Sequence, residues 1–243
     1  MDLFQSPALV TYVTVIVMFI VALVISRILD RVWARTLPWP RIYYLVSAPG
    51  VVVHESAHMA GCLLTGAKIK NVVFFSEKGG SVTYATPPVP WLGNLIIGTA
   101  PLFFIPLVLA IITGIFVQYG GCILPVTPIS LNTSGAFVLL VTTPVSIIYQ
   151  NLIVHFNGWF LLYLFINVSL VLSLAPSTQD LKNAAAGLLI LIGFGFAIIF
   201  SGIPVAVGVL SGFLLLISTG LFIGLVFELI AFIASIPLIA LYS

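Results

Sequence analysis

Two histidines and a glutamate stand within five residues, in the order His54-Glu55-Ser56-Ala57-His58. This is the pattern H-E-x-x-H. On a helix, positions i and i+4 lie one turn apart on the same face. Two imidazoles placed in this way can bind one Zn²⁺ at about 2.0–2.1 Å each. Glu55 follows the first histidine, so it can face a water molecule at the metal and take its proton as a general base.

The surroundings of this motif favour metal chemistry over coincidence. The chain has only three histidines and six acidic residues among 243, so chance alone would produce the motif roughly once in a thousand such sequences. The motif also lies in an apolar stretch, where a charged side chain costs about 2.5–3.5 kcal/mol on insertion scales. The alternative is a buried His–Glu–His network that serves only helix packing, and we consider it the weaker interpretation.

The composition indicates a membrane protein. Hydrophobic residues make up 61% of the chain and charged residues 6%, whereas a soluble domain carries about 25% charged residues. So few charges cannot cover a water-facing surface, and such high hydrophobicity excludes a disordered chain. A net charge of +2 without a basic run gives no support for nucleic-acid binding. We therefore expect a single polytopic domain over residues 1–243.

The apolar stretches predict an all-α fold of about six transmembrane helices, because a spanning helix needs roughly 20 apolar residues. The predicted spans are residues 8–25, 42–64, 91–117, 152–174, 184–200 and 204–241. The last is long enough to be one projecting helix or two joined spans, and both remain open. Residues 134–149 are apolar but short and contain Pro144, so we expect an interfacial or re-entrant segment there.

A small β-hairpin is predicted after the second span. Residues 68–75 and 81–85 are rich in β-branched and aromatic residues, and the turn sequence Ser76-Glu77-Lys78-Gly79-Gly80 separates them. An exposed strand edge of this kind could hold an extended peptide by β-augmentation, although simple packing or a surface lid is an equal alternative. The candidate substrate-binding residues are Val72, Val73, Phe74, Gly79 and Gly80.

A catalytic zinc usually has three protein ligands, and Asp180 is the favoured third ligand. Pro176 should break the helix at the end of the fourth span, and counting spans places Asp180 on the same membrane face as His58. The alternative role for Asp180 is a helix N-cap. The other candidates are weaker as ligands: Asp2, Asp30, Glu77, His155, Glu228 and, at i+4 from His58, Cys62.

The H-E-x-x-H in an early span, the Gly-Gly-containing β segment and the Asp after a proline resemble the site-2 protease family of intramembrane metalloproteases. The similarity covers about residues 42–183, including Ile97-Gly98-Thr99-Ala100-Pro101-Leu102, and leaves 8–26 and 184–243 as accessory helices. The family's usual Asp-Gly pair is absent, since Leu181 follows Asp180. The resemblance implies a minimal form without a PDZ domain. His54, His58 and Asp180 would bind one Zn²⁺ per chain, with Glu55 as the catalytic acid–base.

The function expected from this resemblance is hydrolysis of transmembrane segments of other membrane proteins. The chain would be a multi-pass protein of a prokaryotic cell membrane, with the zinc end toward the cytosol. The charges themselves do not decide the orientation, because four arginines on one face oppose four lysines on the other. The alternatives are a metal-binding transporter, a zinc hydrolase of lipid-linked substrates and a proteolytically silent scaffold. The oligomeric state is not predicted.

Overall fold

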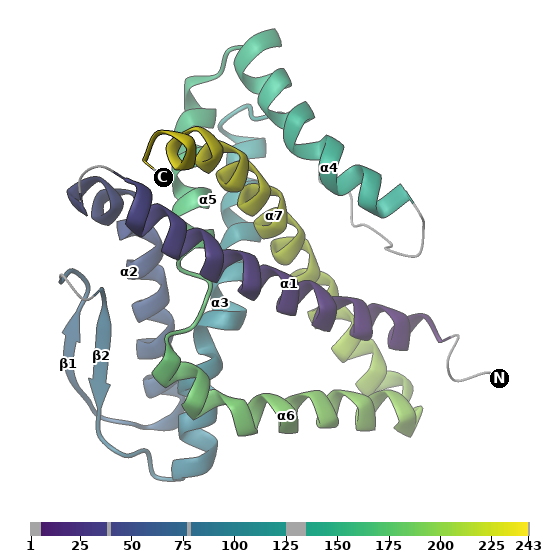
Figure 1. Ribbon diagram of the computed structural model, residues 1–243. Helices are drawn as coiled ribbons and strands as arrows, with labels where there is room; N and C mark the ends of the chain where they lie inside the picture. Colours follow the sequence, from purple (N-terminus) through teal and green to yellow (C-terminus); the bar gives the residue numbers. More distant parts are fainter. Residues whose placement is uncertain (1–5, 38–39, 77–78, 125–134, 243) are drawn as a thin grey trace.

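The computed structural model describes residues 6–37, 40–76, 79–124 and 135–242, which form a mainly helical protein with one β-hairpin (Figure 1). The elements follow one another along the chain in this order: α1 (Pro7–Thr36), α2 (Pro40–Thr65), β1 (Ile69–Val73), β2 (Ser81–Tyr84), α3 (Pro90–Gln118), α4 (Gly135–Ile148), the π-helix η2 (Tyr149–Val154), α5 (Gly158–Leu172), α6 (Thr178–Ser201) and α7 (Pro204–Tyr242).

Three of these helices are long and apolar enough to cross a membrane: Pro7–Thr36, Pro90–Gln118 and Pro204–Pro237. Two shorter apolar helical segments, Gly158–Leu172 and Gly187–Ser201, accompany them. The described residues thus confirm a mostly helical membrane protein with a small hairpin. The number of six spans stays a prediction.

Local sequence signals explain where several helices begin and end. The Ser6 side chain accepts a hydrogen bond from the Leu9 amide at 3.2 Å and caps α1. Asn157 caps α5 in the same way, accepting from the Trp159 amide at 3.0 Å. Such caps satisfy amides that have no partner within the helix. Gly202, with φ of +65°, ends α6 in a left-handed conformation that glycine adopts without steric cost.

Two predicted spans differ from the observed elements. The expected span 152–174 is divided, because η2 ends at Val154 and α5 begins only at Gly158. The buried Asn151 side chain lies in η2 and bonds both the amide and the carbonyl of Ile123, at 2.9 and 2.8 Å. The run 204–241 forms one continuous helix, α7, so the two-span alternative is wrong.

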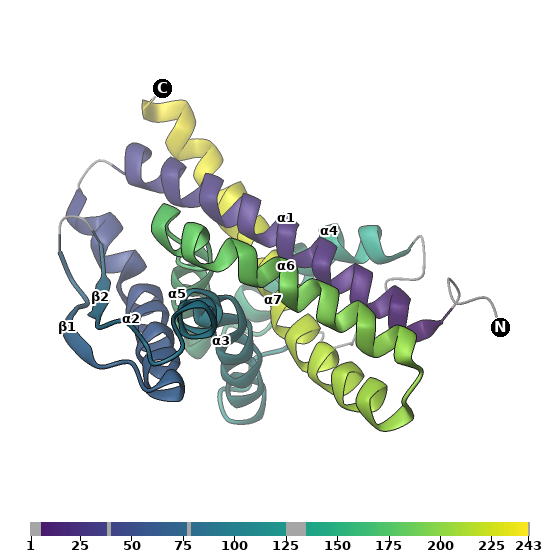
Figure 2. The same ribbon diagram turned by 90° about the horizontal axis from the view of Figure 1, so that it is seen from below.

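Helices α2, α3 and α5 lie side by side and pack closely (Figures 1 and 2). A Cβ at Gly61 of α2 would lie 2.9 Å from the Ile97 Cα of α3. A Cβ at Gly50 would lie 2.0 Å from the Ser169 carbonyl oxygen of α5, and the Gly50 amide donates to Ser169 Oγ at 2.7 Å. These glycines let the backbones approach, as small residues do between membrane helices.

The hairpin confirms the predicted strand pair. β1 and β2 are antiparallel, with Val72 opposite Val82 and Val73 opposite Ser81. A register irregularity follows Ile69. The hairpin lies alongside α2, on the side away from α7 (Figure 1). Since the sheet has two strands among the described residues, each strand has one edge without a strand partner there.

Candidate metal centre

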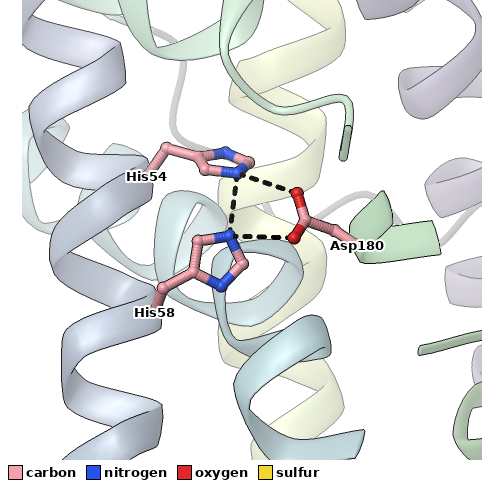
Figure 3. A group of neighbouring side chains, drawn as sticks. All are labelled: His54, His58 and Asp180. Atoms are coloured by element: carbon pink, nitrogen blue, oxygen red, sulfur yellow. Dashed lines mark hydrogen bonds and ion pairs between the residues drawn. The ribbon is translucent and has the colours of Figure 1, made fainter. Parts of the chain in front are cut away.

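Two imidazoles on α2 and one carboxylate on α6 converge on a common point (Figure 3). His54 Nε2 lies 3.2 Å from His58 Nε2. The Asp180 carboxylate faces both rings, with Oδ2 3.8 Å from His54 Nε2 and Oδ1 3.5 Å from His58 Nε2. Both histidines are buried, and Asp180 is partly buried. The helix supplies the histidine pair because i and i+4 share a face.

The other ring nitrogen of each histidine identifies its tautomer. His54 Nδ1 lies 2.7 Å from the Ser173 carbonyl oxygen, and His58 Nδ1 lies 2.8 Å from the Ile97 carbonyl oxygen. A carbonyl oxygen only accepts hydrogen bonds, so each Nδ1 carries the hydrogen. In the neutral ring, Nε2 then presents a lone pair. Metal-binding histidines are commonly oriented by such bonds to backbone carbonyls.

The start of α6 fixes Asp180. Pro176 precedes the helix, Ser177 caps it, and Asp180 completes a capping box. Ser177 donates to Asp180 Oδ2 from its backbone amide at 3.1 Å and from its hydroxyl at 2.5 Å. Burial tends to raise the pKa of Asp180, but the adjacent imidazoles of His54 and His58 and the hydrogen bonds from Ser177 outweigh it and lower the pKa well below its usual range. The carboxylate is therefore ionised beside the histidines.

These three side chains fit a zinc ion. Ligands about 2.0–2.1 Å from a tetrahedral zinc are about 3.3 Å from one another. The two Nε2 atoms are 3.2 Å apart, close to this value, and each of them has a different oxygen of the Asp180 carboxylate within 3.8 Å. The cluster has two imidazole nitrogens and one carboxylate oxygen, a donor set that suits zinc and leaves a fourth position for water or substrate. Among the described residues, these three form the group able to hold a metal.

Glu55 lies next to this group and to the hairpin. It follows His54 on α2, and its side chain is 6% exposed. A Cβ at Gly80 would lie 2.6 Å from Glu55 Cγ and 2.7 Å from Oε1, so the backbone entering β2 passes directly beside the carboxylate. Gly80 leaves room for Glu55 and brings the strand edge to the site.

The other predicted binding residues lie along the hairpin. Val72 and Val73 are within β1, and Gly79 adopts a φ of +91° in the turn. Phe74 and Gly79 line a cleft of about 590 Å³ between the hairpin and α2. Val51 lines the same cleft and would contact a Cβ at Gly80 at 2.7 Å, so the cleft leads toward Glu55.

The rival ligands are not part of the described metal group. Glu228 is fully buried in α7, and His155 is exposed at the end of η2. Cys62 packs in a small apolar cluster with Ala67 and Ile97, as expected for a buried small residue. Asp30 instead accepts a hydrogen bond from the Tyr43 hydroxyl. Asp2 and Glu77 lie outside the described residues.

Several positioning groups were not predicted from the sequence. The carbonyls of Ile97 and Ser173 orient the histidines, but backbone groups carry no sequence signature. Ser169, which receives the Gly50 amide, was also not singled out. A Ser-x-x-x-Ser spacing at the end of α5 was a weak available signal, since Ser169 lies on the helix and Ser173 caps its C-terminus one turn later.

Comparisons with known proteins add no identity. No protein-family model, curated protein or solved structure matches this chain. The functional argument therefore depends on the site itself.

Proposed function

We propose that this chain is an intramembrane zinc metalloprotease that cleaves transmembrane segments of other proteins. The observation that carries the proposal is the convergence of two imidazole Nε2 atoms and a carboxylate within 3.2–3.8 Å, while each Nδ1 is bonded to a backbone carbonyl. Three electron-rich groups repel one another unless a cation lies among them. A zinc ion bound there would polarise a substrate carbonyl and acidify water.

The proposed roles of the residues follow from their positions. His54, His58 and Asp180 hold the metal, and the carbonyls of Ser173 and Ile97 keep both rings aimed at it. Glu55 accepts a proton from the attacking water and passes it to the leaving amine, as a general base and then a general acid. Its burial excludes bulk water, which strengthens its interaction with the reacting groups.

The hairpin and the adjoining cleft support a peptide substrate. A transmembrane helix must unwind before its peptide bonds can react, because its carbonyls are engaged in hydrogen bonds. The strand edge beside Gly80 offers backbone groups to the unwound segment, which would lie in the cleft lined by Tyr43, Val51 and Phe74. We propose that Val72, Val73 and Gly79 contribute to the same strand-like recognition.

The decisive experiment separates metal binding from proteolysis. Purified wild-type protein should contain about one zinc per chain, and His54→Ala and Asp180→Ala should reduce this content strongly. Glu55→Gln should retain zinc but lose all cleavage of a transmembrane substrate reconstituted with it. Cleavage that persists in Glu55→Gln would refute the mechanism. Full zinc content in Asp180→Ala would remove Asp180 from the ligand set.

A further inference from the structure

A second site lies where α1 passes the connection between α5 and α6. It is a cleft of about 410 Å³ lined by Arg27, Arg31 and aliphatic side chains of α1, by Pro176 of the connection and by Leu181 of α6. Arg27 and Arg31 are four residues apart and so lie on one face of the helix. The lining contains no acidic residue.

The positive charges of the Arg27 and Arg31 guanidinium groups are available to an anionic ligand. Arg27 Nη1 donates to the Pro176 carbonyl at 2.7 Å, a bond that leaves its charge uncompensated. Within the described ranges, the recorded ion pairs join only histidines to Asp180, so neither arginine is paired with a carboxylate. The nearest acid along α1, Asp30, is engaged by the Tyr43 hydroxyl of α2. Two such guanidiniums favour a phosphate group, which arginine binds through paired N–H donors.

The apolar part of the cleft identifies what carries the phosphate. Val24 and Ile28 line it, and they continue an exposed aliphatic face of α1, which also includes Val13, Val17 and Ile20. These five side chains are 40–60% exposed in a helix long and apolar enough to span a membrane, so this face contacts lipid chains. The arginines stand at its end, as cationic side chains do at a headgroup layer.

We propose that this cleft binds an anionic phospholipid, with its phosphate between Arg27 and Arg31 and its hydrocarbon chains along Val24 and Ile28. The ligand is a lipid because a free phosphate would leave the aliphatic half of the site without a partner.

This site lies directly behind the third metal ligand. The Ser26 hydroxyl accepts a hydrogen bond from the Ala175 amide at 2.9 Å. Arg27 donates to the carbonyl of the following residue, Pro176. The connection held in this way ends in the capping box that positions Asp180. A lipid phosphate that fixes Arg27 therefore also steadies Asp180. This consequence depends on the proposed metal site, whereas lipid binding itself does not.

The test uses the full chain, freed of metal, in nanodiscs of phosphatidylcholine alone or with one third phosphatidylglycerol. The anionic lipid should raise the melting temperature of the wild type by several degrees. Arg31→Gln should abolish most of this shift, and it is suited to the test because the Arg31 side chain makes no hydrogen bond to the residues that the structure describes. Arg35→Gln, one turn further along and outside the cleft, is the matched control and should keep the shift.

Three outcomes would overturn the proposal. The first is no shift in the wild type. The second is an equal shift in Arg31→Gln and Arg35→Gln, which would show general attraction to a charged surface. The third is the same shift from inorganic phosphate in a neutral detergent, which would show that lipid chains are not needed.

Zinc affinity, measured afterwards in both lipids, should rise several-fold with the anionic lipid in the wild type. A chain that binds no zinc would refute the protease while leaving the lipid result intact.

Discussion

Gly50 is the position where adding a single methyl group should give the most informative test of the proposed metal centre. In Gly50→Ala the new Cβ would lie 2.0 Å from the Ser169 carbonyl oxygen, whereas ordinary contact begins at 3.4 Å. The obstacle is backbone and cannot rotate away, so α2 and α5 must separate by about 1.4 Å. Overpacking of this kind costs about 3 kcal/mol, and the better helix propensity of alanine returns about 1 kcal/mol.

The net loss of about 2 kcal/mol corresponds to a melting temperature lower by about 4–8 °C for a chain of this size. The separation also stretches the bond between His54 Nδ1 and the Ser173 carbonyl, one turn further along α2. Loss of such an orienting bond weakens metal binding by about 10–100-fold. Thermal unfolding and competitive zinc titration measure the two effects on one preparation.

Gly114→Ala is the matched control, because nothing lies within 4 Å of a Cβ at this position of α3. Here the same substitution should raise the melting temperature by about 1–4 °C through helix propensity alone, with zinc affinity unchanged. If Gly50→Ala instead unfolds and binds zinc like the wild type, the close contact of α2 with α5 is wrong. The orienting role of the Ser173 carbonyl on His54 then fails with it.

Three further outcomes are expected. Gly80→Ala should lower proteolysis at least tenfold with zinc content unchanged. The new Cβ would lie 2.6 Å from Glu55 Cγ, whereas the substitution leaves the histidines in place. An equal loss of zinc and activity would contradict this expectation. Glu228→Gln should keep or raise the melting temperature, since neither carboxyl oxygen of this fully buried residue has a hydrogen-bond partner among the described residues; a fall of several degrees would reveal a partner. Removal of zinc by a chelator should lower the melting temperature reversibly. The lost stability should be about 2.7 kcal/mol if zinc had been present at 100 times its Kd, and Asp180→Asn should show a smaller change. An irreversible loss in both proteins would point to chelator damage.

The part of the site that is local in sequence was predictable. His54, Glu55 and His58 lie on one helix, and helix geometry alone brings the two imidazoles together. The hairpin was predictable for a similar reason, because its turn residues and β-branched runs are adjacent in the chain. In both cases a short-range rule determines the arrangement.

The longer-range features needed information that side-chain types do not carry. The break before α5 depends on Asn157 as a cap and on Asn151 bonding a distant loop, and neither is visible in a hydropathy pattern. Likewise, Ile97 and Ser173 act through backbone carbonyls, which every residue possesses. Only the packing of α3 and α5 against α2 gives these carbonyls their role.

Asp180 shows how a local role and a distant one can support each other. The sequence offers helix capping and metal binding as alternatives, yet in the structure the carboxylate that caps α6 also faces both histidines. Oδ2 accepts from Ser177 and also lies 3.8 Å from His54 Nε2, while Oδ1 lies 3.5 Å from His58 Nε2. The cap fixes the rotation of the carboxylate, so both oxygens stay directed at the histidines, and binding of a metal there would cost little further side-chain entropy. Helix capping would therefore hold Asp180 in place for metal binding, and the two predicted roles of this residue are compatible.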